Sequence, residues 1–439
     1  MRLLLLILIS YSSNILSNED KNNNLNNFFD KEPAVQRQIF IEKLKKILPT
    51  KVHQDEETEI SNQIRSNNKK TVESLLVESL ELISNGRLGL ALNTIDELIT
   101  LVPNFQLAHL IRGDILTAYS MSIKNFGGSA IEINSDKVTE LHKEAKRRIK
   151  GYLIAQNNYK APKFNIIPKK NDEYLIYVDM DSSRLFIFEN NEGQYSYTSD
   201  YYISIGKNGY GKRFEGDKKT PYGTYFLQKK IERDLTDFYG SGAYPIDYPN
   251  EFDKLNKFTG SGIWIHGTPK STYSRPPEAS DGCVVLANKD IDAIKNILNT
   301  PGTPVILSNV SITDLSFRSA GDIKIEQTQL LGKIKKWEES WAATNFKRYI
   351  DFYSNDAKYN NINFKEWSLR KKNVFRKSKD VRISIKNISI YEYPSLKDQL
   401  RIVMFDQDYT SNLIKNSTRK KQIWKLNNGA WKIIYEGTK

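Results

Sequence analysis

Residues 261–286 read SGIWIHGTPKSTYSRPPEASDGCVVL: a short apolar run ending on a histidine, a polar loop, and a turn ending on a cysteine. The apolar run before His266 predicts a β-strand, because β-branched and aromatic residues favour strands. The Ser-Asp-Gly before Cys283 predicts a tight turn, since glycine tolerates backbone angles that other residues avoid. The stretch therefore predicts a β-rich domain in which both side chains lie beside turns.

These two side chains predict nucleophilic chemistry. Cys283 is the single cysteine among 439 residues, so it cannot form an internal disulfide. A thiol attacks as its thiolate, which a neighbouring histidine can generate by accepting the proton. Gly282 allows successive backbone N–H groups to converge where an oxyanion would form. The alternative is a small buried cysteine beside a strand-end histidine without catalytic function.

The other histidines do not predict a metal site. Of the four in the chain, only His266 lies in the same predicted domain as Cys283. His109 and His142 lie in helical patterns without acidic or cysteine neighbours at ligand spacing, so we interpret them as structural or surface residues. No metal and no cofactor is predicted.

Composition indicates a globular chain with a basic balance. Hydrophobic residues make up 39% and charged residues 27%, which is ordinary for folded proteins. The net charge of +13 favours anionic partners, among them acidic wall polymers and nucleic acid. Lys, Asn and Ile are frequent throughout, so the charge alone is weak support for either. No nucleic-acid motif is recognisable, and we expect no nucleic-acid partner.

The N-terminus predicts export. Arg2 precedes the apolar run Leu3–Ile9, and a small residue follows at Ser17, which is the pattern of a secretory signal peptide over residues 1–17. The run is shorter than the ~20 apolar residues that span a bilayer. No later stretch is long and apolar enough, so no transmembrane span is expected. The alternatives are an uncleaved anchor or a buried first helix. We expect a periplasmic or cell-envelope protein.

A polar linker and helix are expected over residues 18–70, followed by a helical region over 71–160. Leu75, Leu76, Leu80 and Ile83 recur at helical spacing. The segments NGRLGLA (85–91) and NFQLAHLIRGDIL (104–116) resemble a tetratricopeptide-type helical hairpin. One clear unit is fewer than the roughly three that a solenoid needs, so this region is predicted to be an accessory domain.

Residues 172–308 are predicted to form a mostly β domain. Its strands are β-branched and aromatic runs, and a hairpin turn is expected at Asp179–Ser183. The expected strands are 174–178, 184–188, 201–205, 220–227, 261–266 and 303–307, with a loop at 206–216 and a helix at 291–298.

A polar join is expected near residues 311–327, followed by an α+β domain over 328–437. Trp337, Trp341, Phe346 and Tyr349 repeat at helical spacing, and strand patterns begin at Val381. This order resembles the nuclear-transport-factor-2-like cone fold, which is most often a binding or dimerising module. The predicted fold class is thus a multidomain chain with a helical N-terminal region, a mostly β catalytic domain and an α+β cone-like C-terminal domain.

Residues 172–308 also resemble a known enzyme family, the YkuD-type L,D-transpeptidase catalytic domain. The matching segments are HGT (266–268), SDGCVVL (280–286) and, upstream, ISIGKNGYGKRFEGDKKTPYGTYFL (203–227). The resemblance covers about a third of the chain. It implies a YkuD-like fold, peptidoglycan stem peptides as substrate, and roles in cell-wall organisation and cell shape.

The resemblance also implies residue roles. Cys283 would attack the carbonyl of the third residue of a tetrapeptide stem and expel D-alanine, while His266 takes and later delivers the proton. The backbone carbonyl of Gly267 would orient the imidazole. The backbone N–H groups of Asp281, Gly282 and Cys283 would hold the oxyanion. An amine or water would then resolve the thioester.

One departure from the family pattern concerns substrate handling. Many members carry arginine two residues after the cysteine, where this chain has Val285. Arg275 can supply a carboxylate-binding charge instead, or be a solvated loop residue. The remaining candidates for substrate binding, which can equally belong to the core or the turn, are Tyr239, Tyr248, Trp264 and Ser280.

The leading prediction is an exported L,D-transpeptidase. The alternative within the same chemistry is a hydrolytic L,D-carboxypeptidase or an amidase acting on the same stem peptide. The alternative of another class is a non-catalytic cell-wall scaffold. In each case a protein partner can bind through the helical or the C-terminal domain.

Overall fold

The computed structural model describes residues 70–119, 135–156, 162–232, 235–359, 362–394 and 399–438. The expected signal peptide and nearly all of the expected linker lie outside these residues. The chain divides into two compact units, Met1–Asn157 with Thr268–Pro277, and Asn158–Gly267 with Glu278–Lys439. No helix among the described residues is long and apolar enough to cross a membrane.

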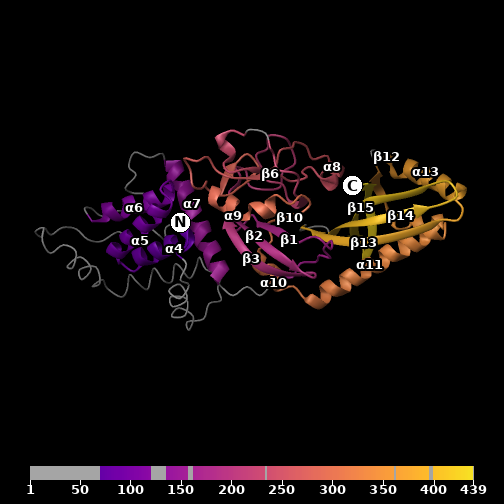
Figure 1. The fold of residues 1–439 in the computed structure, drawn as a ribbon, viewed down its shortest axis with the longest axis horizontal. Helices are drawn as coiled ribbons and strands as arrows, with labels where there is room; N and C mark the ends of the chain where they lie inside the picture. Colours follow the sequence, from indigo (N-terminus) through magenta and orange to yellow (C-terminus); the bar gives the residue numbers. More distant parts are fainter. Residues whose placement is uncertain are drawn as a thin grey trace, which may run out of the picture. The chain divides into compact units, whose positions relative to one another are not determined.

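The first unit contains the helices α4 (Val72–Ser84), α5 (Leu88–Leu101), α6 (Gln106–Ala118) and α7 (Ser135–Gln156) (Figure 1). The Thr71 hydroxyl begins α4 by accepting a hydrogen bond from the Ser74 amide. Residues at the predicted helical spacing, such as Leu76 and Ile95, are fully buried. The helical N-terminal region is confirmed.

The loop Thr268–Pro277 belongs to this helical unit. The ring of Tyr273 packs edge-on against Phe105, with 4.9 Å between centroids. The Ser274 hydroxyl donates to Glu144 at 2.6 Å, and Arg148 donates to the same carboxylate at 2.9 Å. The polar loop between the histidine and the cysteine is therefore tied to helix α7.

The predicted catalytic domain is built on a five-stranded sheet in the order β3-β2-β1-β10-β5. Its strands are β1 (Tyr174–Asp179), β2 (Arg184–Asn191), β3 (Gln194–Tyr202), β5 (Gly223–Phe226) and β10 (Pro304–Ser308). The Asp179 carboxylate accepts from the Ser182 amide at 2.9 Å and shapes the predicted hairpin. Helix α9 (Asn288–Leu298) contributes Ile291, Ile294 and Leu298 to the same core as β1 and β10.

Two smaller sheets carry the site. One has the order β6-β7-β9, with β6 (Ala243–Pro245), β7 (Trp264–His266) and β9 (Val284–Val285). The other pairs β4 (Ile205–Gly206) with β8 (Glu278–Ser280). The segment between β6 and β7 includes the short helix α8 (Glu251–Leu255), and the 3₁₀ turn η1 (Asp237–Tyr239) precedes β6.

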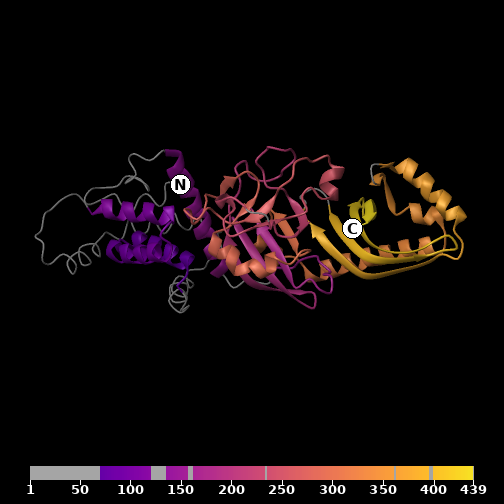
Figure 2. The ribbon, with the colours of Figure 1, turned by 45° about the horizontal axis from the view of Figure 1, so that its top comes forward.

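The C-terminal domain has a six-stranded sheet in the order β12-β11-β16-β15-β14-β13. Figure 2 shows the long strands of this sheet, in orange and yellow, bending along their length. The strands are β11 (Tyr353–Tyr359), β12 (Ile362–Asn363), β13 (Arg382–Tyr393), β14 (Leu400–Thr410), β15 (Lys415–Asn427) and β16 (Ala430–Thr438). The helices are α11 (Ala320–Ala342), α12 (Phe346–Ile350) and α13 (Phe364–Lys377), and the short helix α10 (Ile312–Ser316) lies between the two domains in the sequence. The α+β prediction is confirmed.

The polar join expected near residues 311–327 contains α10 and the first part of α11. The Ser319 hydroxyl accepts from the Asp322 amide and begins α11 at Ala320. The buried residues of α11 start only at Leu330. The first part of the helix therefore contributes no buried residue and shows no apolar periodicity.

The end of β13 packs on the catalytic domain within the second unit. The ring of Tyr391 lies edge-on to Phe226 at 5.2 Å, and both rings are buried. The Thr224 hydroxyl donates to the Glu392 carbonyl oxygen at 2.6 Å. The catalytic and C-terminal domains therefore share a packed interface.

Candidate active site

His266 is held at the end of a central strand. It pairs with Ala243 on β6 and with Val285 on β9, and its carbonyl oxygen accepts from the Leu286 amide at 2.9 Å. The residue is 1% exposed. Strand pairing on both sides and burial together fix the backbone from which the imidazole projects.

One backbone contact orients the imidazole. Nδ1 of His266 lies 2.7 Å from the carbonyl oxygen of Gly267, the contact that the family resemblance implies. A carbonyl oxygen only accepts hydrogen bonds, so in the neutral ring Nδ1 carries the proton and Nε2 carries the lone pair. The Tyr239 ring packs edge-on against the imidazole, 5.1 Å between centroids. This arrangement gives Nε2 the form that a general base requires.

Cys283 lies between β8 and β9, directly before the strand that pairs with β7. In the parallel pairing of β7 with β9, Ile265 lies opposite Val284. Cys283 directly precedes Val284, and His266 directly follows Ile265. Cys283 is half-buried, and its Sγ donates to the Gly262 carbonyl oxygen at 3.5 Å. His266 thus ends one strand, and Cys283 directly precedes the neighbouring strand.

The turn before the thiol is fixed by Ser280. The Ser280 hydroxyl accepts from the Gly282 amide at 3.1 Å and donates to the Cys283 carbonyl oxygen at 2.6 Å. Ser280 is buried, so it shapes the turn instead of lining a pocket. The Gly282 amide, one of the three predicted oxyanion donors, is directed at Ser280 in this structure.

The remaining predicted substrate residues lie in three different places. Tyr239 packs against Trp264 at 5.0 Å between ring centroids, so both lie beside the histidine. Tyr248 belongs to the hydrophobic core, where burial raises the pKa of its phenol and its hydroxyl donates to the Thr259 carbonyl oxygen at 3.1 Å. Arg275 lies in the loop that groups with the helical unit, and it is half-buried.

Val285 is an interior strand residue. It is 2% exposed, and its amide and carbonyl groups exchange hydrogen bonds with Ser204 at 2.9 Å each. The position where many L,D-transpeptidases carry arginine is therefore apolar and enclosed here. A charge for the substrate has to come from another residue.

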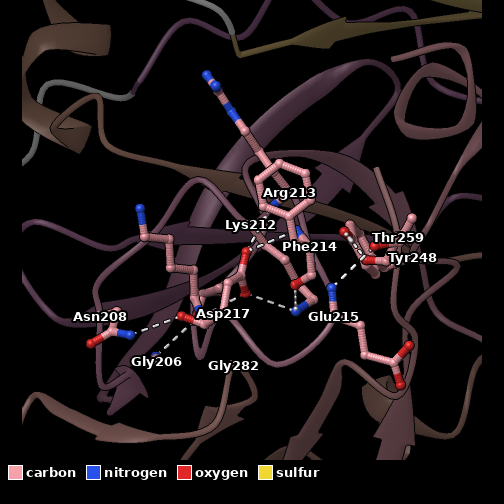
Figure 3. A network of polar contacts seen from close by, with 12 residues as sticks. Gly206, Asn208, Lys212, Arg213, Phe214, Glu215, Asp217, Tyr248, Thr259 and Gly282 are labelled. Carbon is pink, nitrogen blue, oxygen red and sulfur yellow. Dashed lines mark hydrogen bonds and ion pairs between the residues drawn. The ribbon is translucent and has the colours of Figure 1, made fainter. Parts of the chain in front are cut away.

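Sequence reasoning missed the loop between β4 and β5 as part of the site. The loop was predicted as irregular, without any functional residue. It folds around the carboxylate of Asp217, close to Gly282 (Figure 3). The Gly-Asp at 216–217, which is typical of a turn closed by a side-chain acceptor, is the signal that could have found it. Within the described residues, no three His, Cys, Asp or Glu side chains are placed to hold a metal ion.

Comparisons with known proteins agree with this geometry. The model of the YkuD family, described as an L,D-transpeptidase catalytic domain, matches residues 173–307. A second model, the Cds6 C-terminal NTF2-like domain, matches residues 329–437. No curated protein matches the chain.

Three solved structures have a similar fold. The helical cell shape determining protein Pgp2 from Campylobacter jejuni is 22% identical, with a TM-score of 0.52, over 65% of this chain and 98% of that chain. A point mutant of the same protein gives a TM-score of 0.54 at 22% identity, over 68% and 99%. Bd1075 from Bdellovibrio bacteriovorus is 27% identical, with a TM-score of 0.52, over 63% and 97%.

The match to the YkuD family model supports a peptidoglycan-related function. Residues 173–307 therefore form a domain similar to the L,D-transpeptidase catalytic domain of the YkuD family, and residues 329–437 form a nuclear-transport-factor-2-like domain.

Proposed function

We propose that the protein is an exported L,D-transpeptidase that uses Cys283 as nucleophile and His266 as general base. The observation that carries this proposal is the contact between Nδ1 of His266 and the Gly267 carbonyl oxygen. This contact assigns the lone pair of the neutral imidazole to Nε2. His266 ends β7, which pairs with β9, the strand that begins directly after Cys283. A histidine in that form can take the thiol proton and yield the attacking thiolate.

The reaction proceeds in two half-reactions. The thiolate of Cys283 attacks the carbonyl carbon of the third stem residue, and the peptide bond to D-alanine breaks as His266 returns the proton to the leaving amine. The acyl group is then a thioester on Sγ. An amine of a second stem peptide attacks the thioester, loses a proton to His266, and releases the thiol.

The buried Val285 favours a second candidate, the hydrolytic L,D-carboxypeptidase. Without an arginine at this position, less charge is available to hold a peptide carboxylate, and water can resolve the thioester. Tetrapeptide muropeptides separate the two. Cross-linked dimers, or exchange of D-alanine for an added D-amino acid, support the transferase, whereas release of D-alanine with tripeptide as the sole product contradicts it.

A non-catalytic scaffold makes a different prediction. Cys283→Ala in the full chain removes the nucleophile from a half-buried position, so the fold is expected to survive. If the variant still supports the cellular phenotype and wild-type protein releases no D-alanine, the scaffold is correct and the enzyme proposal is wrong. A protein partner of the helical or C-terminal domain is compatible with both proposals.

A further inference from the structure

The loop between β4 and β5 is organised by one carboxylate (Figure 3). Oδ2 of Asp217 accepts from the amides of Arg213 at 2.8 Å and Phe214 at 3.0 Å. Oδ1 accepts from Lys212 Nζ at 2.9 Å and from the Lys219 amide at 3.1 Å. Because four donors converge on this one group, it fixes the path of the chain from residue 212 to residue 219.

The carboxylate is held in its ionised form. Burial raises the pKa of Asp217, but the donors from Phe214, Arg213, Lys212 and Lys219 outweigh it and lower that pKa to about 2. The Lys212 side chain is 4% exposed, and an ammonium so deeply buried requires a counter-charge. Asp217 is therefore an ionised carboxylate that pairs with the buried Lys212 within the loop.

One side of this loop supports the turn before the nucleophile. A Cβ built at Gly282 would lie 2.8 Å from the Lys219 carbonyl oxygen, closer than real side chains approach, and Gly282 has a φ of +126°. The Lys207 amide donates to the Ser280 carbonyl oxygen at 2.7 Å. The backbone that Asp217 fixes is thus in direct contact with the turn that carries the thiol.

The other side of the loop holds the segment that the thiol faces. The Thr259 amide donates to the Arg213 carbonyl oxygen at 2.9 Å, and the Glu215 amide donates to Thr259 Oγ1 at 3.1 Å. Three residues further along the chain, the Gly262 carbonyl oxygen accepts from Sγ of Cys283. The turn at residues 280–282 and the segment at residues 259–262 therefore both contact the loop that Asp217 organises.

We propose that Asp217 is a positioning residue for Cys283, an inference that rests on the proposed acyl-transfer function. Asp217 fixes the Lys219 backbone, which contacts the turn at Gly282. It also fixes the Arg213 backbone, which binds the segment from Thr259 to Gly262. Without the carboxylate, four donors lose their acceptor and Lys212 loses its counter-charge, so both supports of Cys283 shift. A displacement of about 1 Å in a reacting group can cost about 10²-fold in rate.

Asp217→Asn in the full chain tests this proposal, since it keeps the side-chain shape but removes the charge and replaces one of the two acceptor oxygens with an NH₂ donor. We expect the rate of Cys283 acylation by a carbapenem to fall about tenfold to a hundredfold. Hydrogen exchange of the amides at 259–262 and 280–286 is expected to become faster. Alkylation by iodoacetamide needs an accessible thiolate but no aligned oxyanion donors, so its rate is expected to fall less than the acylation rate.

Asp200→Asn is the matched control, because Asp200 accepts from the buried Arg184 at 2.6 Å in the same domain. We expect it to lower the melting temperature without changing acylation or the exchange of 280–286 below that temperature. Unchanged acylation and exchange in Asp217→Asn would overturn the proposal, and so would equal losses in both variants. A wild-type protein that no carbapenem acylates contradicts the proposed function instead, and the exchange measurement then still decides whether Asp217 positions Cys283.

Discussion

The imidazole of His266 owes its direction to the residue that follows it. The Gly267 carbonyl oxygen receives the Nδ1 proton, a task that other enzymes give to a carboxylate or amide side chain. This contact needs no particular side chain, so no acidic or amide residue near the histidine marks it in the sequence. The motif resemblance implied the role, and the strand geometry of β7 supplies the contact.

The position of Gly282 has no room for a side chain. In Gly282→Ala the added methyl group meets the Lys219 carbonyl oxygen at 2.8 Å, and the φ of +126° adds backbone strain of about 1–3 kcal/mol. We expect a lower free energy of unfolding and acylation at least about tenfold slower, because the turn must move. Urea unfolding and the rate of carbapenem acylation measure both effects.

Gly209→Ala is the control for this prediction. Gly209 also has a positive φ, +75°, but a Cβ there would meet nothing within 4 Å. The variant therefore carries strain without the collision, and its acylation rate is expected to stay within about twofold of wild type. Wild-type acylation of Gly282→Ala would show that the turn tolerates a side chain, against the account.

At the scale of elements, the loop between β4 and β5 makes the free energy of unfolding depend on pH, through the ionisation of Asp217. The folded pKa of Asp217, about 2, lies below its ordinary value of 3.8, so the unfolded chain binds this proton more tightly. The stabilisation is present above about pH 4 and is lost as the pH falls toward 2. Between about pH 5 and pH 2, the free energy of unfolding is expected to fall more steeply for wild type than for Asp217→Asn. Parallel profiles would contradict this.

The elements that sequence could predict are those with strong local patterns. Strands β1 and β2 are apolar runs on either side of a hairpin turn, and α9 has a clear apolar stripe. The start of α11 was missed because its exposed first part carries no such stripe. The loop around Asp217 was missed because its supports come from Thr259 and Gly282, which are distant in sequence.

At the scale of the whole molecule, the catalytic and C-terminal domains are expected to unfold together. Tyr391→Ala removes a buried ring that packs on Phe226, which should cost about 3–5 kcal/mol and separate the unfolding of the two domains. Tyr391→Phe keeps the ring and removes only the hydroxyl that donates to Asp172, so it should retain one transition. Calorimetry of the full chain distinguishes the two, and a single unchanged transition in Tyr391→Ala would contradict this interface.

Domain order followed from the changes in periodicity along the chain, whereas the contacts between distant segments did not. The hydrogen bond from Ser274 to Glu144 joins residues 130 positions apart. Arg275 was considered for substrate binding from its place between the histidine and the cysteine. Nothing in the sequence indicated that this loop would pack on a helical region that precedes it.

Activation of Cys283 by His266 as an acyl-accepting nucleophile can be measured from the mass of the full chain after exposure to a carbapenem. We expect one covalent adduct, located on the peptide that contains Cys283 and absent from Cys283→Ala. His266→Gln should form the adduct about 10²- to 10⁴-fold more slowly, because it removes the base. An unmodified wild-type thiol, or an adduct that forms equally fast without His266, would contradict the account.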